Sequence, residues 1–330
     1  MNYRTVEELN RETHRLAQTL SGDIDLVVGI PRSGVLVANL LCLYLDVPMT
    51  DVKGLCEERI FDTGSRYQRS TAFDELDSVL VVDDSVLTGG EMKRTRERLT
   101  KHEFPFDITF AAVYISPRGH QYVDHWCEVV PSPRIFEWNI LQHTRLPEFC
   151  VDIDGILCRD PTDGENDDGE NYREFLTTVE PNIIPKQRIG CLVTSRLEKY
   201  RPETEEWLTD HGIEYDSLVM MDVPDMETRR KRGNYGQYKA DVYESVDAAL
   251  FIESDPSQAA EICRETNRPV FCYDTNEMLN PSFIGRTKRR IPEIVSDIKA
   301  EPVLFPLRSA YQISARCYHW ILRARKSKCS

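Results

Sequence analysis

The stretch Val79-Leu-Val-Val-Asp-Asp-Ser-Val-Leu-Thr-Gly-Gly-Glu91 decides the fold of the first part of the chain. Four apolar residues run into two adjacent acids, Asp83 and Asp84, and then into Thr88-Gly-Gly90 and a polar helical pattern. This order predicts a buried strand, a glycine-rich turn and a helix over 91–101. Glycines let the backbone approach an anion, and a helix N-terminus offers free N–H groups. We therefore expect the turn to bind a phosphate.

The acid pair adds a second kind of contact to this turn. Open α/β sheets bind ligands at the carboxyl ends of their strands, so Asp83 and Asp84 are expected beside the phosphate. Such a site suits a sugar phosphate, with the phosphate in the turn and the hydroxyls on the acids. The stretch resembles the ribose 5-phosphate signature of type I phosphoribosyltransferases. The resemblance implies that this domain uses 5-phosphoribosyl 1-pyrophosphate (PRPP) and Mg²⁺, with Asp83 and Asp84 in catalytic positions.

A second anion-binding turn is predicted upstream. Residues 25–30 have the pattern of a short buried strand, and 35–45 that of an apolar helix. Between them, a turn of Arg, Ser and Gly precedes the helix N-terminus, as anion sites often do. In the resembled family this position is the pyrophosphate loop, which implies pyrophosphate contacts from Arg32, Ser33 and Gly34.

The polar segment over 56–70 lies between the two motifs, where the family has a mobile loop that closes over PRPP. Closure would exclude water from an oxocarbenium-like centre. A solvated surface hairpin is the alternative interpretation. With this loop included, the resemblance implies further PRPP-binding residues: Lys53, Arg59, Arg66, Asp83, Asp84, Ser85, Thr88, Gly89 and Gly90.

Three residues bear on the acceptor. Transferases that act on purine bases usually carry an acid three positions after the acid pair, where this chain has Leu87. Glu91 replaces the usual Thr or Ser at the end of the phosphate turn, and we expect it to point away from the phosphate that it would repel. Trp138 is expected to close the acceptor pocket by stacking on a base or a sugar face, with core packing as the alternative.

A second strand that ends in acids opens the remainder of the chain. In Glu148-Phe-Cys-Val-Asp-Ile-Asp-Gly-Ile-Leu157, Asp152 and Asp154 flank one residue and so project to the same side. This stretch resembles motif I of haloacid dehalogenase-like phosphatases. Elements similar to the other three motifs of that family follow in order: a strand over 189–194 that ends at Thr194, then Lys239, then a strand over 249–255 that contains Glu253 and Asp255.

The residue types in these four elements suit phosphate ester hydrolysis. Asp152 is placed to attack phosphorus and form an aspartyl phosphate, while Asp154 exchanges a proton with the leaving oxygen and with water. Thr194 and Lys239 would hold the phosphoryl oxygens. Mg²⁺ would bind Asp152, the backbone carbonyl of Asp154, and either Glu253 or Asp255. The gaps hold no large cap. A basic run over 229–232 is interpreted as a solvated face or as a clamp for an anionic substrate.

Length and composition set the domain organisation. At 330 residues we expect an α/β protein with two doubly wound parallel-sheet (Rossmann-like) domains. A type I phosphoribosyltransferase domain over 1–147 would precede a haloacid dehalogenase-like phosphatase domain with a minimal cap over 148–300. A basic, aromatic helix is expected over 301–330. It would dock on its own domain or on a second subunit in a homodimer, or lie on an anionic membrane.

Charge and cysteine content narrow the partners and the compartment. A formal net charge of −14 argues against nucleic acid as the main partner. The chain has no apolar run long enough to span a membrane and no signal-peptide pattern at its start. Its ten cysteines form no C-x-x-C pairs, which favours buried reduced thiols. We expect a cytoplasmic protein, or one at the inner face of the membrane.

Together the two resemblances imply a bifunctional ribofuranosylation enzyme that uses Mg²⁺ in both domains. The first domain would transfer 5-phosphoribosyl from PRPP to an acceptor, and the second would remove the 5-phosphate. The arrangement is similar to the transferase–phosphatase pair that installs ribofuranose in bacterial polysaccharides, which implies a glycan hydroxyl, lipid-linked, as acceptor. The alternatives are a small-molecule acceptor, nucleobase salvage followed by nucleotidase action, and a PRPP or nucleotide sensor without turnover. The sequence leaves open the acceptor, the anomeric configuration and the oligomeric state.

Overall fold

The first of two parallel sheets contains both of the predicted anion-binding turns. The computed structural model describes residues 1–20, 24–61, 63–64 and 72–281. Strand order in the first sheet is β3-β2-β4-β5-β6, with every pairing parallel. Its strands are β2 (Leu26–Gly29), β3 (Met49–Asp51), β4 (Ser78–Val86), β5 (Asp107–Ile115) and β6 (His125–Val129).

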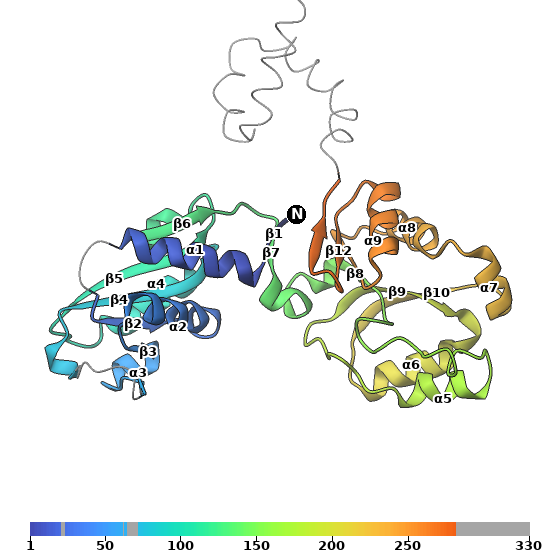
Figure 1. Cartoon of the computed structure of the whole chain (residues 1–330), viewed down its shortest axis with the longest axis horizontal. Coiled ribbons are helices and arrows are strands. Elements are labelled where there is room, and N and C mark those ends of the chain that lie inside the picture. Colours follow the sequence, from blue (N-terminus) through green and yellow to red (C-terminus); the bar gives the residue numbers. More distant parts are fainter. Residues whose placement is uncertain (21–23, 62, 65–71, 282–330) are drawn as a thin grey trace, which may run out of the picture.

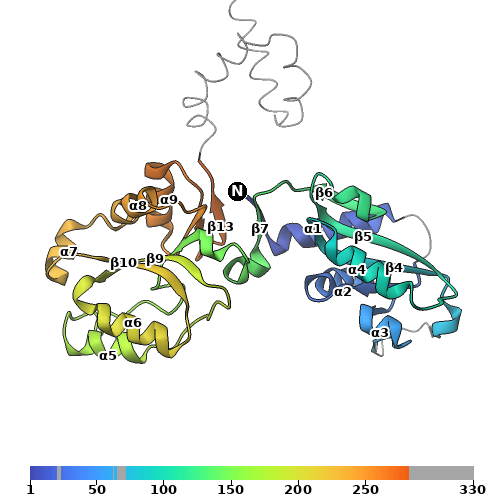
Figure 2. The ribbon, with the colours of Figure 1, turned by 180° about the vertical axis from the view of Figure 1, so that it is seen from behind.

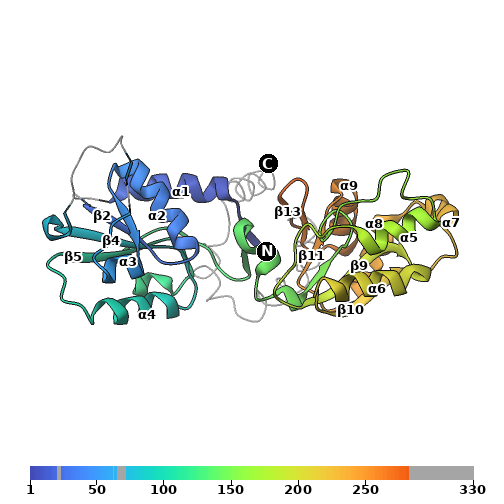
Figure 3. The same cartoon turned by 90° about the horizontal axis from the view of Figure 1, so that it is seen from below.

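Helices cover both faces of this sheet. They are α1 (Val6–Thr19), α2 (Ser33–Leu45), α3 (Val52–Cys56) and α4 (Gly90–Leu99). Because side chains alternate along a strand, Leu80 and Val82 pack with α1 and α2, while Val79 and Val81 pack with α3 and α4. Figure 3 shows α1 and α2 on one side of the strands and α4 on the other. Burial on both faces explains the continuous apolar run in β4.

β4 differs from the prediction at its carboxyl end. The sequence analysis ended the strand at the acid pair, but β4 continues to Val86 and pairs there with Ile115 of β5. Its pairing with β2 stops earlier, at Gly29 and Val82. The chain also reverses its strand order here, because β3 lies on one side of β2 and β4 on the other. The acids therefore lie at a topological switch point, which is the usual ligand position of an open sheet.

The second sheet has the strand order β10-β9-β8-β11-β12-β13, parallel except for the β12–β13 pair. Its strands are β8 (Phe149–Val151), β9 (Ile189–Leu197), β10 (Tyr215–Met221), β11 (Leu250–Glu253), β12 (Val270–Cys272) and β13 (Glu277–Leu279). Its switch point lies between β8 and β11, because the chain first adds strands beyond β9 and then returns to the other side of β8. The predicted α/β architecture with parallel sheets is confirmed for the described residues.

Two pairs of helices pack on opposite faces of the second sheet. Tyr172 of α5 and Trp207 of α6 belong to one core cluster, and Tyr243 of α8 and Ile262 of α9 to another. The helices are α5 (Glu170–Thr178), α6 (Arg201–Asp210), α7 (Met226–Arg232), α8 (Tyr235–Ser245) and α9 (Pro256–Thr266). Figure 1 shows α7 at the end of β10, beyond the body of the sheet. No helix of the described residues is long and apolar enough to cross a membrane.

A short parallel pair joins the two parts of the chain. β1 (Asn2–Arg4) pairs with β7 (Arg134–Phe136), and Figure 2 shows β7, next to the N-terminus, between the two sheets. Tyr3 Oη donates a hydrogen bond of 2.5 Å to Asn276 Oδ1, so the first residues contact the second sheet's lobe. The predicted tail over 301–330 and Arg66 lie outside the described residues. The eight described cysteines are free, as predicted for reduced thiols.

Gly34 offers a test of this packing. A Cβ at Gly34 would lie 2.7 Å from the carbonyl oxygen of Val82 and 3.0 Å from Cα of Asp83, both of them backbone atoms. We expect Gly34→Ala to lower the free energy of unfolding by about 1–3 kcal/mol through overpacking. The measurement is urea denaturation followed by circular dichroism. Gly164→Ala is the control, because its Cβ would meet nothing within 4 Å. Equal midpoints for the two variants would contradict the predicted overpacking.

Candidate functional site

The carboxylate of Asp84 joins three segments of the first lobe. Ser33 Oγ, at the start of α2, donates a hydrogen bond of 2.8 Å to Asp84 Oδ1. Trp138 Nε1, from the 3₁₀ helix over Glu137–Gln142, donates one of 2.9 Å to Asp84 Oδ2. The Asp84 N–H in turn donates to Asp83 Oδ1 at 2.8 Å. The predicted pyrophosphate turn, the acid pair and the predicted acceptor residue are thus brought together.

The acid pair is buried, and neither acid forms an ion pair with another described residue. Asp83 and Asp84 are 8% and 5% exposed. Burial, and then the negative charge of Asp84, raise the pKa of Asp83 well above its usual value. A cation bound at the pair would reverse this penalty, so the two carboxylates suit a divalent ion held together with the substrate.

The Trp138 ring is already in contact with other side chains and is not free to stack on a ligand from both faces. Its ring stacks on Phe136, with centroids 4.8 Å apart and planes at 10°, and Phe136 stacks on Tyr114. With both the stack and the Asp84 bond in place, the indole is oriented from two sides. From the sequence, Trp138 was expected to stack on a base or a sugar face, or to pack in the core. Its bond to the acid pair was not predicted.

The other predicted PRPP-binding residues have varied surroundings. Gly89 has a positive φ of 76° as N-cap of α4, so glycine suits the phosphate turn. Glu91 is half-exposed and pairs with Arg94, which confirms that it points outward. Lys53 and Arg59 are exposed beside Glu57. Arg32 and Thr88 are exposed, while Ser85 is half-buried.

Arg134 is a residue near this site that sequence reasoning missed. It is 7% exposed, and burial lowers its pKa while the charges of Asp84 and Asp83 raise it. Its Nη1 has no hydrogen-bond partner among the described residues. It lies in the segment that leads to Trp138. The sequence around a single arginine in such a segment does not predict that its side chain is buried.

A pocket of about 400 Å³ lies at the switch point of the second sheet. Lys239 Nζ, on α8, donates to Asp152 Oδ2 at 2.6 Å and to Glu253 Oε2 at 2.7 Å. All three side chains are at most 7% exposed. The structure thus brings together Asp152, which follows β8, with Lys239 and with Glu253 of β11 in one buried cluster.

The pKa directions in this cluster follow from burial and charge. Burial raises the pKa of Asp152, and burial together with the charge of Asp152 raises that of Glu253 to about 7. Burial lowers the pKa of Lys239, but the charges of Asp152 and Glu253 outweigh it and raise the pKa overall. The lysine is therefore the cation that keeps this acid pair in place.

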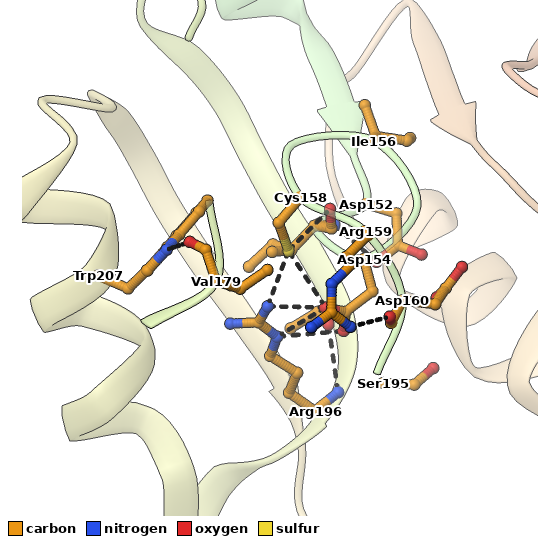
Figure 4. A network of polar contacts seen from close by, with 12 residues as sticks. Asp152, Asp154, Ile156, Cys158, Arg159, Asp160, Val179, Ser195, Arg196 and Trp207 are labelled. Carbon is orange, nitrogen blue, oxygen red and sulfur yellow. Dashed lines mark hydrogen bonds and ion pairs between the residues drawn. The ribbon is translucent and has the colours of Figure 1, made fainter. Parts of the chain in front are cut away.

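Asp154 has its own cation, Arg196, which the sequence analysis missed. Arg196 Nε and Nη2 donate to the Asp154 carboxylate, the shortest distance being 2.7 Å, and Nη2 also contacts Cys158 Sγ at 3.2 Å (Figure 4). Arg196 is 0% exposed. A signal was available, because Arg196 lies two residues after Thr194 and alternate residues of a strand share a face.

Two hydroxyl residues occupy the end of β9. Thr194 is fully buried, and its Oγ1 accepts a hydrogen bond of 3.2 Å from the Arg196 N–H. The neighbouring Ser195 lines the pocket, and its Oγ has no hydrogen-bond partner among the described residues. The sequence analysis named only Thr194, so Ser195 is an additional hydroxyl for a ligand.

The donor set of the pocket fits Mg²⁺. No group of three or more metal-ligating side chains is preassembled among the described residues. The pocket lining nevertheless holds six carboxylates and three cationic side chains, and such an excess of hard oxygen donors suits a magnesium ion. Glu253 uses both oxygens on Lys239 and the Asp255 N–H. Asp255 caps α9 through Oδ1 alone.

Comparison with known proteins supports one of the two resemblances. Residues 3–145 match the family model described as a phosphoribosyl transferase domain. A xanthine-guanine phosphoribosyltransferase of Idiomarina loihiensis is 32% identical over 146 residues, which covers 42% of this chain and 86% of that protein. A hypoxanthine/guanine phosphoribosyltransferase of Ferroglobus placidus is 32% identical over 87 residues, 24% of this chain and 46% of that protein. The solved xanthine-guanine-hypoxanthine phosphoribosyltransferase of Helicobacter pylori is 17% identical, with a TM-score of 0.34 over 42% of this chain and 93% of that chain.

The buried Arg196–Asp154 pair predicts a large effect on stability. Arg196→Met would leave the Asp154 charge unpaired, and Asp154 is only 17% exposed. We expect a loss of about 3 kcal/mol in the free energy of unfolding, measured by urea denaturation. Arg188→Met is the matched control, because Arg188 pairs with Asp216 where both side chains are at least half-exposed. Such a surface pair contributes about 1 kcal/mol at most. Similar losses in the two variants would show that burial of the Arg196 pair carries no extra weight.

Proposed function

Because the chain belongs to the phosphoribosyltransferase family through residues 3–145, we propose a two-step reaction. The first domain transfers 5-phosphoribosyl from PRPP to an acceptor hydroxyl, and the second domain hydrolyses the 5-phosphate of the product. The observation that carries the first step is the Asp84 carboxylate, which contacts the pyrophosphate turn through Ser33 and the acceptor side through Trp138.

The first site supplies one partner for each part of PRPP. The N-terminus of α4 at Gly89-Gly90 would hold the 5-phosphate, and the turn at Arg32-Ser33 the pyrophosphate. Asp83 and Asp84 would accept hydrogen bonds from the ribose hydroxyls. The bond between ribose C1 and the pyrophosphate oxygen breaks, and the acceptor oxygen bonds to C1. The acceptor's proton goes to the departing pyrophosphate. Mg²⁺, held at the acid pair together with PRPP, would neutralise the leaving pyrophosphate.

Leu87 favours a hydroxyl acceptor over a purine base. The side chain is 48% exposed and carries no charge to handle base protonation. A glycan hydroxyl, lipid-linked and reached through membrane contact of the tail, is the acceptor that we favour. A purine base is the second candidate, because the relatives are named as xanthine-guanine and hypoxanthine/guanine transferases.

The second step is supported by the clustering of residues that are far apart in the sequence. Asp152 would attack phosphorus as the bond to the ribose 5-oxygen breaks, and Asp154 would give that oxygen a proton. Water then attacks the aspartyl phosphate, Asp154 takes its proton, and inorganic phosphate leaves. Lys239 orients Asp152, and Arg196 orients Asp154.

Additional groups complete the second site. The hydroxyls of Thr194 and Ser195, near the end of β9, would donate hydrogen bonds to the phosphoryl oxygens. Mg²⁺ would be held by Asp152, the Asp154 carbonyl and Asp255, and would neutralise the phosphoryl group. We favour Asp255 over Glu253 because only one of its oxygens has a protein partner among the described residues.

The two steps predict that Asp152→Asn stalls the reaction after transfer. With PRPP, Mg²⁺ and a panel of glycan hydroxyls and purine bases, mass spectrometry should find the acceptor plus a phosphoribosyl group in the variant. Wild type should yield the acceptor plus ribosyl. Asp163→Asn is the control, an exposed acid outside the pocket lining. Identical final products from the wild type and Asp152→Asn would show that the two-step scheme is wrong.

The complementary variant acts on the first step. Asp84→Asn removes the charge that Ser33 and Trp138 bind, so release of pyrophosphate from PRPP should fall at least about a hundredfold. Hydrolysis of added ribose 5-phosphate should stay within about twofold of the wild type, because the second pocket has no lining residue from the first sheet. The readouts are separate assays for pyrophosphate and for phosphate. Normal pyrophosphate release in the variant would exclude Asp84 from the transfer step.

A further inference from the structure

The wall of the second pocket formed by β9 and α7 has hydrogen-bond donors without partners. Arg229 Nη1 donates to the backbone oxygen of Ser195 at 3.0 Å, and Nη2 donates to Asn166 Oδ1 at 3.3 Å. Its Nε is buried and has no partner among the described residues, and neither has Ser195 Oγ. A buried donor left unpaired costs free energy, so this corner of the pocket suits a ligand that accepts hydrogen bonds.

Positive charge on this wall is not neutralised by the residues that the structure describes. Lys231 of the same basic run pairs with Glu227, but neither Arg229 nor Arg230 has an ion-pair partner in the described part of the chain. Both arginines line the pocket, whereas Lys231 and Arg232 do not. This difference favours the interpretation of Arg229 and Arg230 as a clamp for an anionic substrate over that of the whole run as a solvated face.

The arginine wall is distinct from the group of acids at the switch point. Asp152 and Asp154 follow β8, and Glu253 and Asp255 lie at the end of β11. Lys239, the cation on that side, already bonds to Asp152 and Glu253. The arginines instead come from α7, and Arg229 bonds to the backbone oxygen of Ser195 in β9. A ligand whose phosphate sits at the acids therefore presents its remaining part toward Arg229 and Arg230.

We propose that Arg229 and Arg230, with the Ser195 hydroxyl, bind a second anionic group of the phosphatase substrate. The substrate class is a phosphomonoester that carries a further phosphate or carboxylate away from the bond that is cleaved. This inference rests on the proposed phosphatase step. It also specifies the first step, because the acceptor that receives the phosphoribosyl group is then itself anionic. A purine base would bring no such group.

The test compares ribose 5-phosphate with ribose 1,5-bisphosphate in the full-length protein with Mg²⁺. Phosphate release gives kcat/KM, and mass spectrometry identifies ribose 1-phosphate as the product of 5-phosphate cleavage. Wild type should favour the bisphosphate at least about tenfold, the effect of a charge-assisted contact. Arg230→Gln and Arg229→Lys should each reduce this preference about tenfold. The lysine keeps the charge of Arg229 but not its fork of donors.

Arg232→Gln is the matched control, because it removes the same charge from α7 without touching the pocket lining. If Arg232→Gln lowers the preference for the bisphosphate as much as Arg230→Gln does, general electrostatic attraction explains the preference. That result would overturn the proposal. An equal fall for both substrates in the Arg229 and Arg230 variants would assign the arginines to the reacting phosphate and also overturn it. Wild-type hydrolysis without any preference would do the same. If neither ester is hydrolysed by the wild type, the proposed phosphatase step itself fails.

Discussion

A parallel sheet that is covered by helices on both faces accommodates charged side chains mainly where the pairing between neighbouring strands stops. β4 illustrates this constraint: Val79 to Val82 are fully buried, and charge first occurs at Asp83. β8 repeats it, with Phe149 to Val151 fully buried before Asp152. In both sheets the acids lie beside the point at which the chain reverses its order of strand addition, so neighbouring loops diverge and leave room for a ligand. Asp83 and Asp84 come where β2 has stopped pairing with β4, and Asp152 comes directly after β8. The positions of both candidate sites follow from this one requirement.

Buried acids then need partners, and the two sheets solve this differently. In the second sheet Asp152 bonds to Lys239 and Asp154 to Arg196, so each acid of the pair has a separate cation. In the first sheet Asp84 is bonded by the neutral donors Ser33 and Trp138. Neutral donors orient a carboxylate without neutralising it, and the nearby Arg134 forms no ion pair with the acids in the described part of the chain. A cation brought by the ligand would therefore add to the positive charge at the first site. PRPP, the substrate proposed for this site, would arrive with a metal ion that supplies this charge.

The sequence predicted the elements that local pattern determines. The strand, turn and helix around Thr88 and the acids after β8 and β4 follow from apolar runs and glycines, and residues over 189–194 form a strand as expected. It could not predict which side chains meet across the sheet. Arg196 is bonded to Asp154, 42 residues away, and the buried Arg134 lies close enough to Asp84, 50 residues away, for their charges to interact. No periodicity encodes such long-range proximity. The end of β4 was also misjudged, because β5 continues to pair after β2 has stopped.

The same distinction between local and long-range information bears on the acceptor. Leu87 and Trp138 are visible in the sequence, but only the structure shows that Trp138 is bonded to Asp84 and stacked on Phe136. An acceptor that displaced the Trp138 indole would therefore also disturb the carboxylate of Asp84, to which the indole is bonded. At the second site, the unpaired donors of Arg229 and Ser195 require an acceptor of hydrogen bonds. In the proposed two-step reaction, one product would occupy both pockets in turn. An anionic acceptor joined to ribose 5-phosphate would suit both, whereas a neutral base would suit only the first.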